Sequence, residues 1–449
     1  MFPPGRWLLP MFWMISNSIC GIRSYRILVI APFESHSQCM LVTPYIKALK
    51  DRGNQLTVIH AYKHCMHKIE DVTFIRIWYN NNVFAGATLT EPIMPFGEKS
   101  VKNVWDRIYN WFYTTEEWLL MNLVFLPKQP LIHDHFFGHL EKSFQEIRQD
   151  FALMLLNQHF SLFRARPNVP GMVEVAGLHI PKEDPQLPSD LKVFIDEAEH
   201  GVILFSLGLE QDSKDLPRKT QEILMETFKS VPQRVIWKFD GEPTMSLGSD
   251  IYHSKLLPQQ AILAHPNVKL FISHCGMISL IEAAYYAKPV LGLPSFFDQF
   301  RNLEIMKEEG AALQLNINSL TVRELKDAVH SMINEPEYRE SALAISQRFR
   351  DQPMHPLDTD IYWTEYIIRY KGANHMKGSQ SQLNLFEYYS LDNFIMVVSR
   401  LSLVVALVFL ALSKSRRWLN HLSTSAKPFL PDDIQHNRKE YLSNFSANI

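Results

Sequence analysis

Residues 271–299 read FISHCGMISLIEAAYYAKPVLGLPSFFDQ, and this stretch decides the fold. Its apolar pattern predicts a strand that ends at Ser273, a helix over 278–287 and a second strand over 289–293. A strand, a helix and a parallel strand form one crossover unit of a doubly wound sheet. Ligands of such sheets bind outside the carboxyl ends of the strands. We therefore expect a ligand at the turn that follows Ser273.

The turn between this strand and this helix has the features of an anion site. The first N–H groups of a helix have no partner within it, and the helix dipole favours a negative charge there. Gly276 lets the backbone approach a diphosphate closely, and His274 can donate a hydrogen bond to a phosphate oxygen. Glu282, one turn into the helix, is expected to accept from ribose hydroxyls. Asp298 and Gln299 follow the next strand at the same sheet edge, where they suit the hydroxyls of a sugar.

The alternation of strands and helices continues on both sides of this stretch, which predicts two doubly wound α/β domains. In the C-terminal domain the expected elements are strands over 202–206, 234–239 and 268–273 and a helix over 216–231. The N-terminal domain begins with a strand over 27–31, a helix over 43–52 stopped by Gly53, and a strand over 55–60. Farther on, residues 104–125 have helical spacing, and residues 360–370 predict an amphipathic helix that crosses back to the first domain.

Both ends of the chain carry apolar segments. Residues 7–15 (WLLPMFWMI) predict the centre of a secretory leader, with a buried N-terminal helix as the alternative. Residues 394–412 are long enough for a membrane-spanning helix, with Arg400 as their single charge and a buried core helix as the alternative. The basic residues that follow predict a cytoplasmic side: Lys414, Arg416 and Arg417.

Bulk composition excludes nucleic acid as a partner. The chain has 45 basic and 47 acidic residues, so it has no basic field that would release counterions from a nucleic acid. Its 4 cysteines lie far apart and predict neither a disulfide framework nor paired metal ligands. We expect no metal and no bound cofactor.

The central stretch resembles the signature of the UDP-glycosyltransferase family, which includes the UDP-glucuronosyltransferases and their insect relatives. The order F-I-S-H-x-G-x-x-S-x-x-E, then a proline and then D-Q, matches that signature. The similarity extends to residues 202–208 (VILFSLG), 234–239 (RVIWKF), 257–266 (LPQQAILAHP) and 358–374. The resemblance implies a GT-B architecture, in which two Rossmann-like doubly wound domains face each other across a cleft, together with a C-terminal transmembrane helix.

The resemblance also implies that the donor is a UDP-sugar, which acts as co-substrate. The donor-binding residues are then Gly208 at the end of the first matched segment, Lys238 on the phosphate side, the Leu257 backbone and Gln259 at the uracil, His274, Gly276, Ser279 and Glu282 at the diphosphate and ribose, and Asp298 with Gln299 at the sugar. Structural roles are the alternatives: a turn histidine at His274, a helix cap at Asp298 and Gln299, and a solvated strand end at Lys238.

The catalytic base implied by the resemblance is His36, in the loop after the first strand. A neutral imidazole would take a proton from an acceptor hydroxyl as its oxygen attacks the anomeric carbon, and in-line displacement of UDP would invert that carbon. A loop histidine without a chemical role is the alternative. The aspartate that orients this base in the family has no counterpart, because a long segment of the acceptor domain is absent between residues 79 and 91.

The donor half departs from the family pattern at a few positions. Leu256 stands where the family has a tryptophan that stacks on uracil, and Leu209 and Ile278 replace a serine and an asparagine near the phosphates. Because an aliphatic side chain lacks a π face, we expect weaker donor binding.

These features predict an inverting enzyme of the endoplasmic reticulum membrane that serves detoxification by moving glucose or glucuronic acid to a small lipophilic acceptor. Its predicted parts are a signal peptide over 1–21, a shortened acceptor-binding domain over 22–165, a linker over 166–195, a UDP-sugar-binding domain over 196–352, a return helix and juxtamembrane segment over 353–392, a transmembrane helix over 393–413 and a cytoplasmic tail over 414–449. Most of the chain is expected in the lumen. The alternative is a catalytically impaired, membrane-tethered variant that binds nucleotide weakly and forms homo- or hetero-oligomers with related transferases.

Overall fold

A computed structural model gives the architecture of the chain. It describes residues 13–14, 25–31, 36–60, 73–76, 104–131, 134, 143–144, 146, 152–163, 165, 168–208, 213–240, 247–295, 298–376, 385–388 and 390–425. The chain divides into two compact units, Met1–Lys377 and Gly378–Ile449.

The larger sheet of the first unit consists of parallel strands. They are β7 (Val202–Ser206), β8 (Arg234–Lys238), β9 (Ile251–Ser254), β10 (Val268–Ser273), β11 (Val290–Gly292) and β12 (Ala312–Gln314). The strand order is β12-β11-β10-β7-β8-β9, so the direction of winding reverses between β7 and β10. Doubly wound sheets bind ligands in the crevice at such a switch point. The carboxyl ends of β7 and β10 are therefore where a site is expected.

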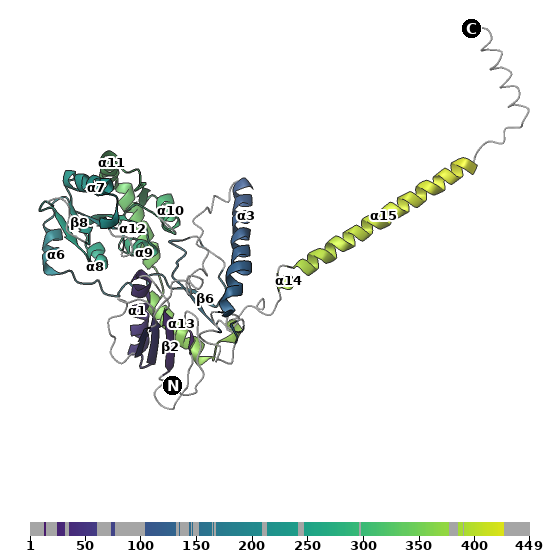
Figure 1. Ribbon diagram of the computed structural model, residues 1–449, viewed down its shortest axis with the longest axis horizontal. Coiled ribbons are helices and arrows are strands. Elements are labelled where there is room, and N and C mark those ends of the chain that lie inside the picture. Colours follow the sequence, from purple (N-terminus) through teal and green to yellow (C-terminus); the bar gives the residue numbers. More distant parts are fainter. Residues whose placement is uncertain are drawn as a thin grey trace, which may run out of the picture. The chain divides into compact units, whose positions relative to one another are not determined.

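Helices cover both faces of this sheet (Figure 1). They are α6 (Ser189–Asp196), α7 (Arg218–Ser230), α8 (Gln259–Ala264), α9 (Met277–Tyr285), α10 (Gln299–Glu308), α11 (Val322–Asn334) and α12 (Pro336–Arg350). Alternate residues of β7 enter separate cores: Val202 and Leu204 pack with residues of α9 and α12, whereas Ile203 and Phe205 pack with residues of α7 and α11. Because both faces are buried, the strand is an unbroken apolar run.

The N-terminal sheet has the strand order β1-β2-β3-β4. Its strands are β1 (Trp13–Met14), β2 (Arg26–Ala31), β3 (Gln55–His60) and β4 (Thr73–Arg76), of which the last three are parallel. β1 lies within the range 1–21 that the sequence assigns to a leader.

Helix α1 (His36–Asp51) connects β2 to β3 and starts earlier than the pattern over 43–52 predicted. The prediction that His36 lies in a loop is therefore wrong at the backbone level, because His36 is the first residue of this helix. Pro44 lies inside α1, and the preceding hydroxyl, Thr43 Oγ1, donates to the Cys39 carbonyl at 2.8 Å. The helix thus runs through a proline that usually marks a helix start.

Cys39 of α1 is disulfide-bonded, and its partner lies outside the described residues. Cys275 is buried with a free thiol. The sequence predicted no disulfide framework and gave no sign of this single bond, because separation along the chain does not report the distance between two cysteines in the fold.

Helix α13 (Pro356–Arg369) packs against α1. The Tyr45 hydroxyl and Thr364 Oγ1 are 3.1 Å apart, and Arg52 pairs with Glu365 at 2.8 Å. Ile361 joins the core of the N-terminal sheet. The chain therefore returns from the second sheet to the first.

Smaller elements complete the first unit. They are α3 (Val104–Leu120), a π-helical turn (Met121–Phe125), 3-10 turns (Leu126–Lys128, Ser213–Asp215 and Asn374–Met376) and the parallel pair β5 (Met154–Leu156) and β6 (Met172–Glu174). β6 and all of α6 except Asp196 lie within 166–195, the range that the sequence assigns to a linker.

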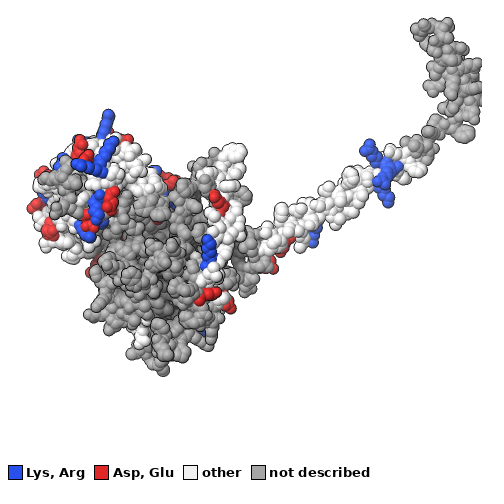
Figure 2. Space-filling model, in the orientation of Figure 1, with Lys and Arg blue, Asp and Glu red and all other residues white. Residues whose placement is uncertain are grey.

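The second unit contains α14 (Leu385–Tyr388) and the long helix α15 (Leu391–Ser425). The stretch Leu391–Leu422 is long and apolar enough to cross a membrane, and none of its apolar window is buried. Figure 2 shows a long uncharged stretch of this helix followed by a basic cluster. At ~1.5 Å per residue, the helix exceeds the ~30 Å of a bilayer core.

Candidate functional site

The turn between β10 and α9 leaves backbone donors without acceptors. Cys275, at its centre, is fully buried and has a φ of 68°, a left-handed conformation that is uncommon for a residue other than glycine. Gly276 is the N-cap of α9 and supplies no capping side chain. Among the described residues, no acceptor is bonded to the N–H of Met277 or Ile278. The start of α9 therefore presents free N–H groups at the switch point.

Asn302 of α10 fixes the orientation of this turn. Its side-chain amide donates to the Cys275 carbonyl at 3.2 Å and to Asp298 Oδ2 at 2.8 Å. The carbonyl and the N–H of a trans peptide point in opposite directions, so this contact turns the Gly276 N–H away from α10. Sequence reasoning missed Asn302, although its spacing of four residues from Asp298 at a helix start is a readable signal.

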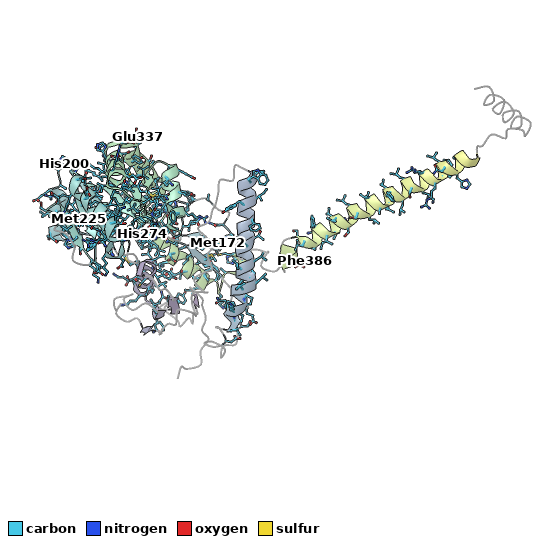
Figure 3. All side chains as sticks on the ribbon, turned by 45° about the horizontal axis from the view of Figure 1, so that its top comes forward. Met172, His200, Met225, His274, Glu337 and Phe386 are labelled. Atoms are coloured by element: carbon cyan, nitrogen blue, oxygen red, sulfur yellow. The ribbon has the colours of Figure 1, made fainter. Side chains whose placement is uncertain are left out.

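The imidazole of His274 lies against two glycine backbones. A β-carbon on Gly208 would lie 2.6 Å from His274 Cε1, and one on Gly276 would lie 2.5 Å from Nε2. Gly208, which follows β7, also has a φ of 83°. Figure 3 shows His274 among the closely packed side chains of this domain. The His274 imidazole thus packs between the ends of β7 and β10 and leaves no room for a β-carbon at Gly208 or Gly276.

Burial holds His274 neutral. Its pKa is lowered to about 4, first by burial and then by the charge of Lys238, while a hydrogen bond to the Ser206 backbone acts in the opposite direction. Its Nδ1 has no hydrogen-bond partner among the described residues. Lys238 is only 8% exposed, so the alternative of a solvated strand end is wrong. At pH 7 this corner therefore combines a neutral imidazole, a buried cation and free N–H groups.

The lowered pKa of His274 predicts a loss of stability in mild acid. The unfolded chain binds a proton at its ordinary pKa of ~6.5 and the folded chain only near 4, so folding is progressively disfavoured as the pH falls through this window. Between pH 7 and pH 5 this one residue is expected to cost about 2 kcal/mol of unfolding free energy. Urea unfolding of wild type and His274→Gln at both pH values measures the difference. A difference between the two proteins that stays constant with pH would contradict the assignment.

Predicted residues on α8 and α9 form one polar network. Gln259 Nε2 donates to Ser279 Oγ at 3.2 Å and to Glu282 Oε2 at 2.6 Å, and its backbone N–H donates to the Leu257 carbonyl at 2.9 Å. Gln260, which the sequence did not single out, donates to Glu282 Oε1 at 2.8 Å. Glu282 is 2% exposed, so its carboxylate is held from both sides.

Asp298 and Gln299 lie at the same carboxyl edge of the sheet. Asp298 is exposed and occupies the N-cap of α10, but its side chain makes no capping hydrogen bond. Gln299 is 4% exposed, and its Oε1 accepts from the Ser295 N–H at 2.8 Å. Asp298 is thus open to a ligand, whereas Gln299 braces the loop after β11.

Some of the other residues that the sequence singled out are only partly described by the structure, or not at all. The side chain of His36 lies outside the described part of the structure, as do Ser35 and Leu209. Leu256 precedes α8 and is 67% exposed, so it is free to cover a bound ring.

Comparisons with known sequences point to one family. A family model described as "UDP-glucoronosyl and UDP-glucosyl transferase" matches residues 103–425. "UDP-glycosyltransferase UGT5" of Dactylopius coccus is 38% identical over 311 residues, which are 68% of this chain and 59% of that protein. "UDP-glucuronosyltransferase 2B13" of Oryctolagus cuniculus is 36% identical over 251 residues, which are 56% of this chain and 47% of that protein. The chain therefore matches about half the length of these curated relatives.

Comparisons with solved structures bear on the fold. Spinosyn forosaminyltransferase SpnP aligns with a TM-score of 0.54 at 14% identity, covering 76% of this chain and 99% of that one. The calicheamicin glycosyltransferase CalG4 aligns with a TM-score of 0.53 at 13% identity, covering 78% and 99%. These likenesses and the parallel sheets confirm the expected GT-B fold class.

Proposed function

The chain belongs to the UDP-glucoronosyl and UDP-glucosyl transferase family, and from this premise we propose that it transfers a sugar from a UDP-sugar to a hydroxyl of a small lipophilic acceptor. The observation that carries the proposal is the row of free N–H groups at the start of α9, beside the neutral His274 ring. A diphosphate supplies the acceptor oxygens that these donors lack. The transferred sugar is glucose or glucuronic acid.

The other parts of the donor are assigned to the residues around this corner. Gln259 and the Leu257 backbone take the uracil, and Glu282 takes the ribose hydroxyls. Asp298, with Gln299 behind it, takes the hydroxyls of the sugar. The hydrogen bonds that already join Gln259 to Glu282 support a shared role for the two side chains.

The transfer step needs a base, and we assign it to His36 at the start of α1. Its imidazole takes the proton of the acceptor hydroxyl as the oxygen attacks the anomeric carbon. The bond from that carbon to the diphosphate breaks, UDP leaves, and the carbon is inverted. Charge that develops on the leaving diphosphate is met by the N–H groups of α9 and by Lys238, so the UDP-sugar is a co-substrate and no further cofactor is required.

The proposal is tested on the full chain in detergent by thermal-shift titration with UDP, UDP-glucose and UDP-glucuronate. ADP serves as the control nucleotide. A ligand at a hundred times its Kd adds about 2.7 kcal/mol of stability, so at least one uridine ligand is expected to raise the Tm while ADP does not. UDP release in the presence of phenols and steroids then measures transfer. A chain that none of the uridine ligands stabilises would contradict the proposal.

A second candidate is a catalytically impaired variant that binds nucleotide weakly and associates with full-length relatives. It is favoured by the match to only about half the length of those relatives. Co-purification with a full-length relative and no detectable turnover would support it. Robust turnover by the isolated chain would exclude it.

We place the protein in the endoplasmic reticulum membrane, with most of the chain in the lumen. The apolar helix α15 supports a single span, and the disulfide at Cys39 supports an oxidising compartment. Protease treatment of intact microsomes is expected to remove only residues of the predicted cytoplasmic tail, 414–449. Digestion of the α/β domains under the same conditions would mean that these domains lie on the cytoplasmic side.

Restoring a ring at Leu256 is expected to strengthen donor binding. Leu256 is 67% exposed beside the proposed uracil position. Aromatic stacking on a base contributes about 1–3 kcal/mol, so Leu256→Trp is expected to lower the Kd for UDP roughly ten- to hundredfold. Calorimetric titration with UDP measures the change, and Leu343→Trp, at an exposed position on α12, is the control. An equal gain in both variants would assign the effect to nonspecific contact.

A further inference from the structure

A histidine that the proposed function does not use faces the carboxylate of Glu282. Glu282 is 2% exposed and His179 is 6% exposed. Nε2 of His179 lies 3.3 Å from Oε1 of Glu282. Neither ring nitrogen of His179 makes a hydrogen bond to another described residue.

A buried carboxylate requires compensation, because removing its charge from water is costly unless hydrogen bonds or an opposite charge replace the solvent. The amides of Gln259 and Gln260 fill part of the acceptor capacity of Glu282, but neither amide carries a charge. In the described part of the chain, the other side chain that faces Oε1 is His179, whose Nε2 lies 3.3 Å away. His179 is therefore the ionisable donor within reach of this carboxylate.

The position of His179 is fixed by the segment that connects the two α/β domains. Val175 and Leu178 pack into the core of the N-terminal sheet, whereas Ala176 and Ile180 pack into the core of the C-terminal sheet. The segment is thus held on both sides, and His179 is the polar residue that it presents to α9. Its carbonyl also accepts from the Gln260 amide that holds Glu282.

We propose that His179 is a positioning residue that orients the Glu282 carboxylate for the ribose hydroxyls of the nucleotide. The inference rests on the proposed function, because it takes Glu282 as the ribose ligand. His179 Nε2 and the Gln260 amide both face Oε1 and hold that side of the carboxylate, so the lone pair of Oε2 that Gln259 does not use is left for the ribose. His179 itself does not touch the nucleotide, and it acts through Glu282.

The test compares two nucleotides that differ only at the ribose. The full chain in detergent is titrated calorimetrically with UDP and with 2′,3′-dideoxy-UDP, which lacks both hydroxyls. Hydrogen bonds to a charged acceptor each contribute on the order of tenfold in affinity, so the wild type is expected to prefer UDP by about a hundredfold. In His179→Leu this ratio is expected to fall below about tenfold, through weaker binding of UDP alone. A purely structural role would weaken both nucleotides equally and leave the ratio unchanged.

Further variants separate the reach of the His179 side chain from the general loss of a histidine. His179→Asn retains a polar side chain but is too short to reach Glu282, so it is expected to lose the preference as His179→Leu does, while the longer His179→Gln retains part of it. His265→Leu is the control, because His265 Nε2 also faces a carboxylate, Asp196 Oδ1 at 3.0 Å, outside the proposed site. The inference would be overturned if a folded Asn or Leu variant preferred UDP over 2′,3′-dideoxy-UDP as strongly as the wild type does. It would also be overturned if the wild type bound the two nucleotides equally well. Failure of the wild type to bind UDP would instead count against the proposed function.

Discussion

Replacing Gly276 with alanine is expected to weaken UDP binding by on the order of a hundredfold. This is about the effect of losing one charge-assisted hydrogen bond to the diphosphate when the His274 ring is displaced. The φ of Gly276 is −61°, so alanine fits the backbone without strain. Its β-carbon, however, would lie 2.5 Å from His274 Nε2, and the ring would have to move out of the corner that faces the start of α9. Calorimetric titration with UDP measures the loss.

Gly248→Ala is the matched control, because a β-carbon at Gly248 meets nothing within 4 Å. This variant is expected to bind UDP as the wild type does. Overpacking at Gly276 is also expected to cost about 1–3 kcal/mol of stability. In a His274→Ala background the same substitution should cost almost nothing, because the clashing ring is gone. Full UDP affinity in a folded Gly276→Ala protein would show that the His274 corner does not hold the diphosphate.

Replacing His36 with alanine is expected to lower the transfer rate by about 10²–10⁴-fold, the usual contribution of a general base. The Kd for UDP should stay unchanged, because His36 lies at the start of α1 and the proposed nucleotide contacts come from the other domain. Initial rates of UDP release at saturating UDP-sugar and acceptor measure the effect.

His330→Ala controls for the loss of a histidine as such, since His330 is exposed on α11. It is expected to keep the wild-type rate. Equal rates for wild type and His36→Ala would remove His36 from the mechanism. A parallel loss of UDP affinity would mean that His36 acts in nucleotide binding instead.

The C-terminal domain could be predicted closely because its sheet is buried on both faces. The unbroken apolar runs over 202–206 and 268–273 coincide with β7 and β10. The helix predicted over 216–231 is α7, which begins two residues later, at Arg218, because Pro217 holds the N-cap in an extended conformation. In the N-terminal domain, Pro44 concealed the true start of α1, since a proline inside a helix is rare.

In the predicted site, residues that are close together in the sequence could be found, whereas contacts between distant segments could not. His274, Gly276, Ser279 and Glu282 share one strand-turn-helix unit, so their order along the chain already fixes their neighbourhood. Contacts that depend on the fold could not be found in this way. His179 reaches Glu282 from a segment far away in the sequence, and this pairing becomes visible only when both cores are packed.

The most direct test of the central claim is a structure of the full chain with UDP bound. Phosphate oxygens are predicted to lie within hydrogen-bond distance of the N–H groups of Gly276 and Met277 and of the His274 ring, in the crevice between β7 and β10. A diphosphate bound at another edge of the sheet, with this turn making no contact to it, would contradict the claim.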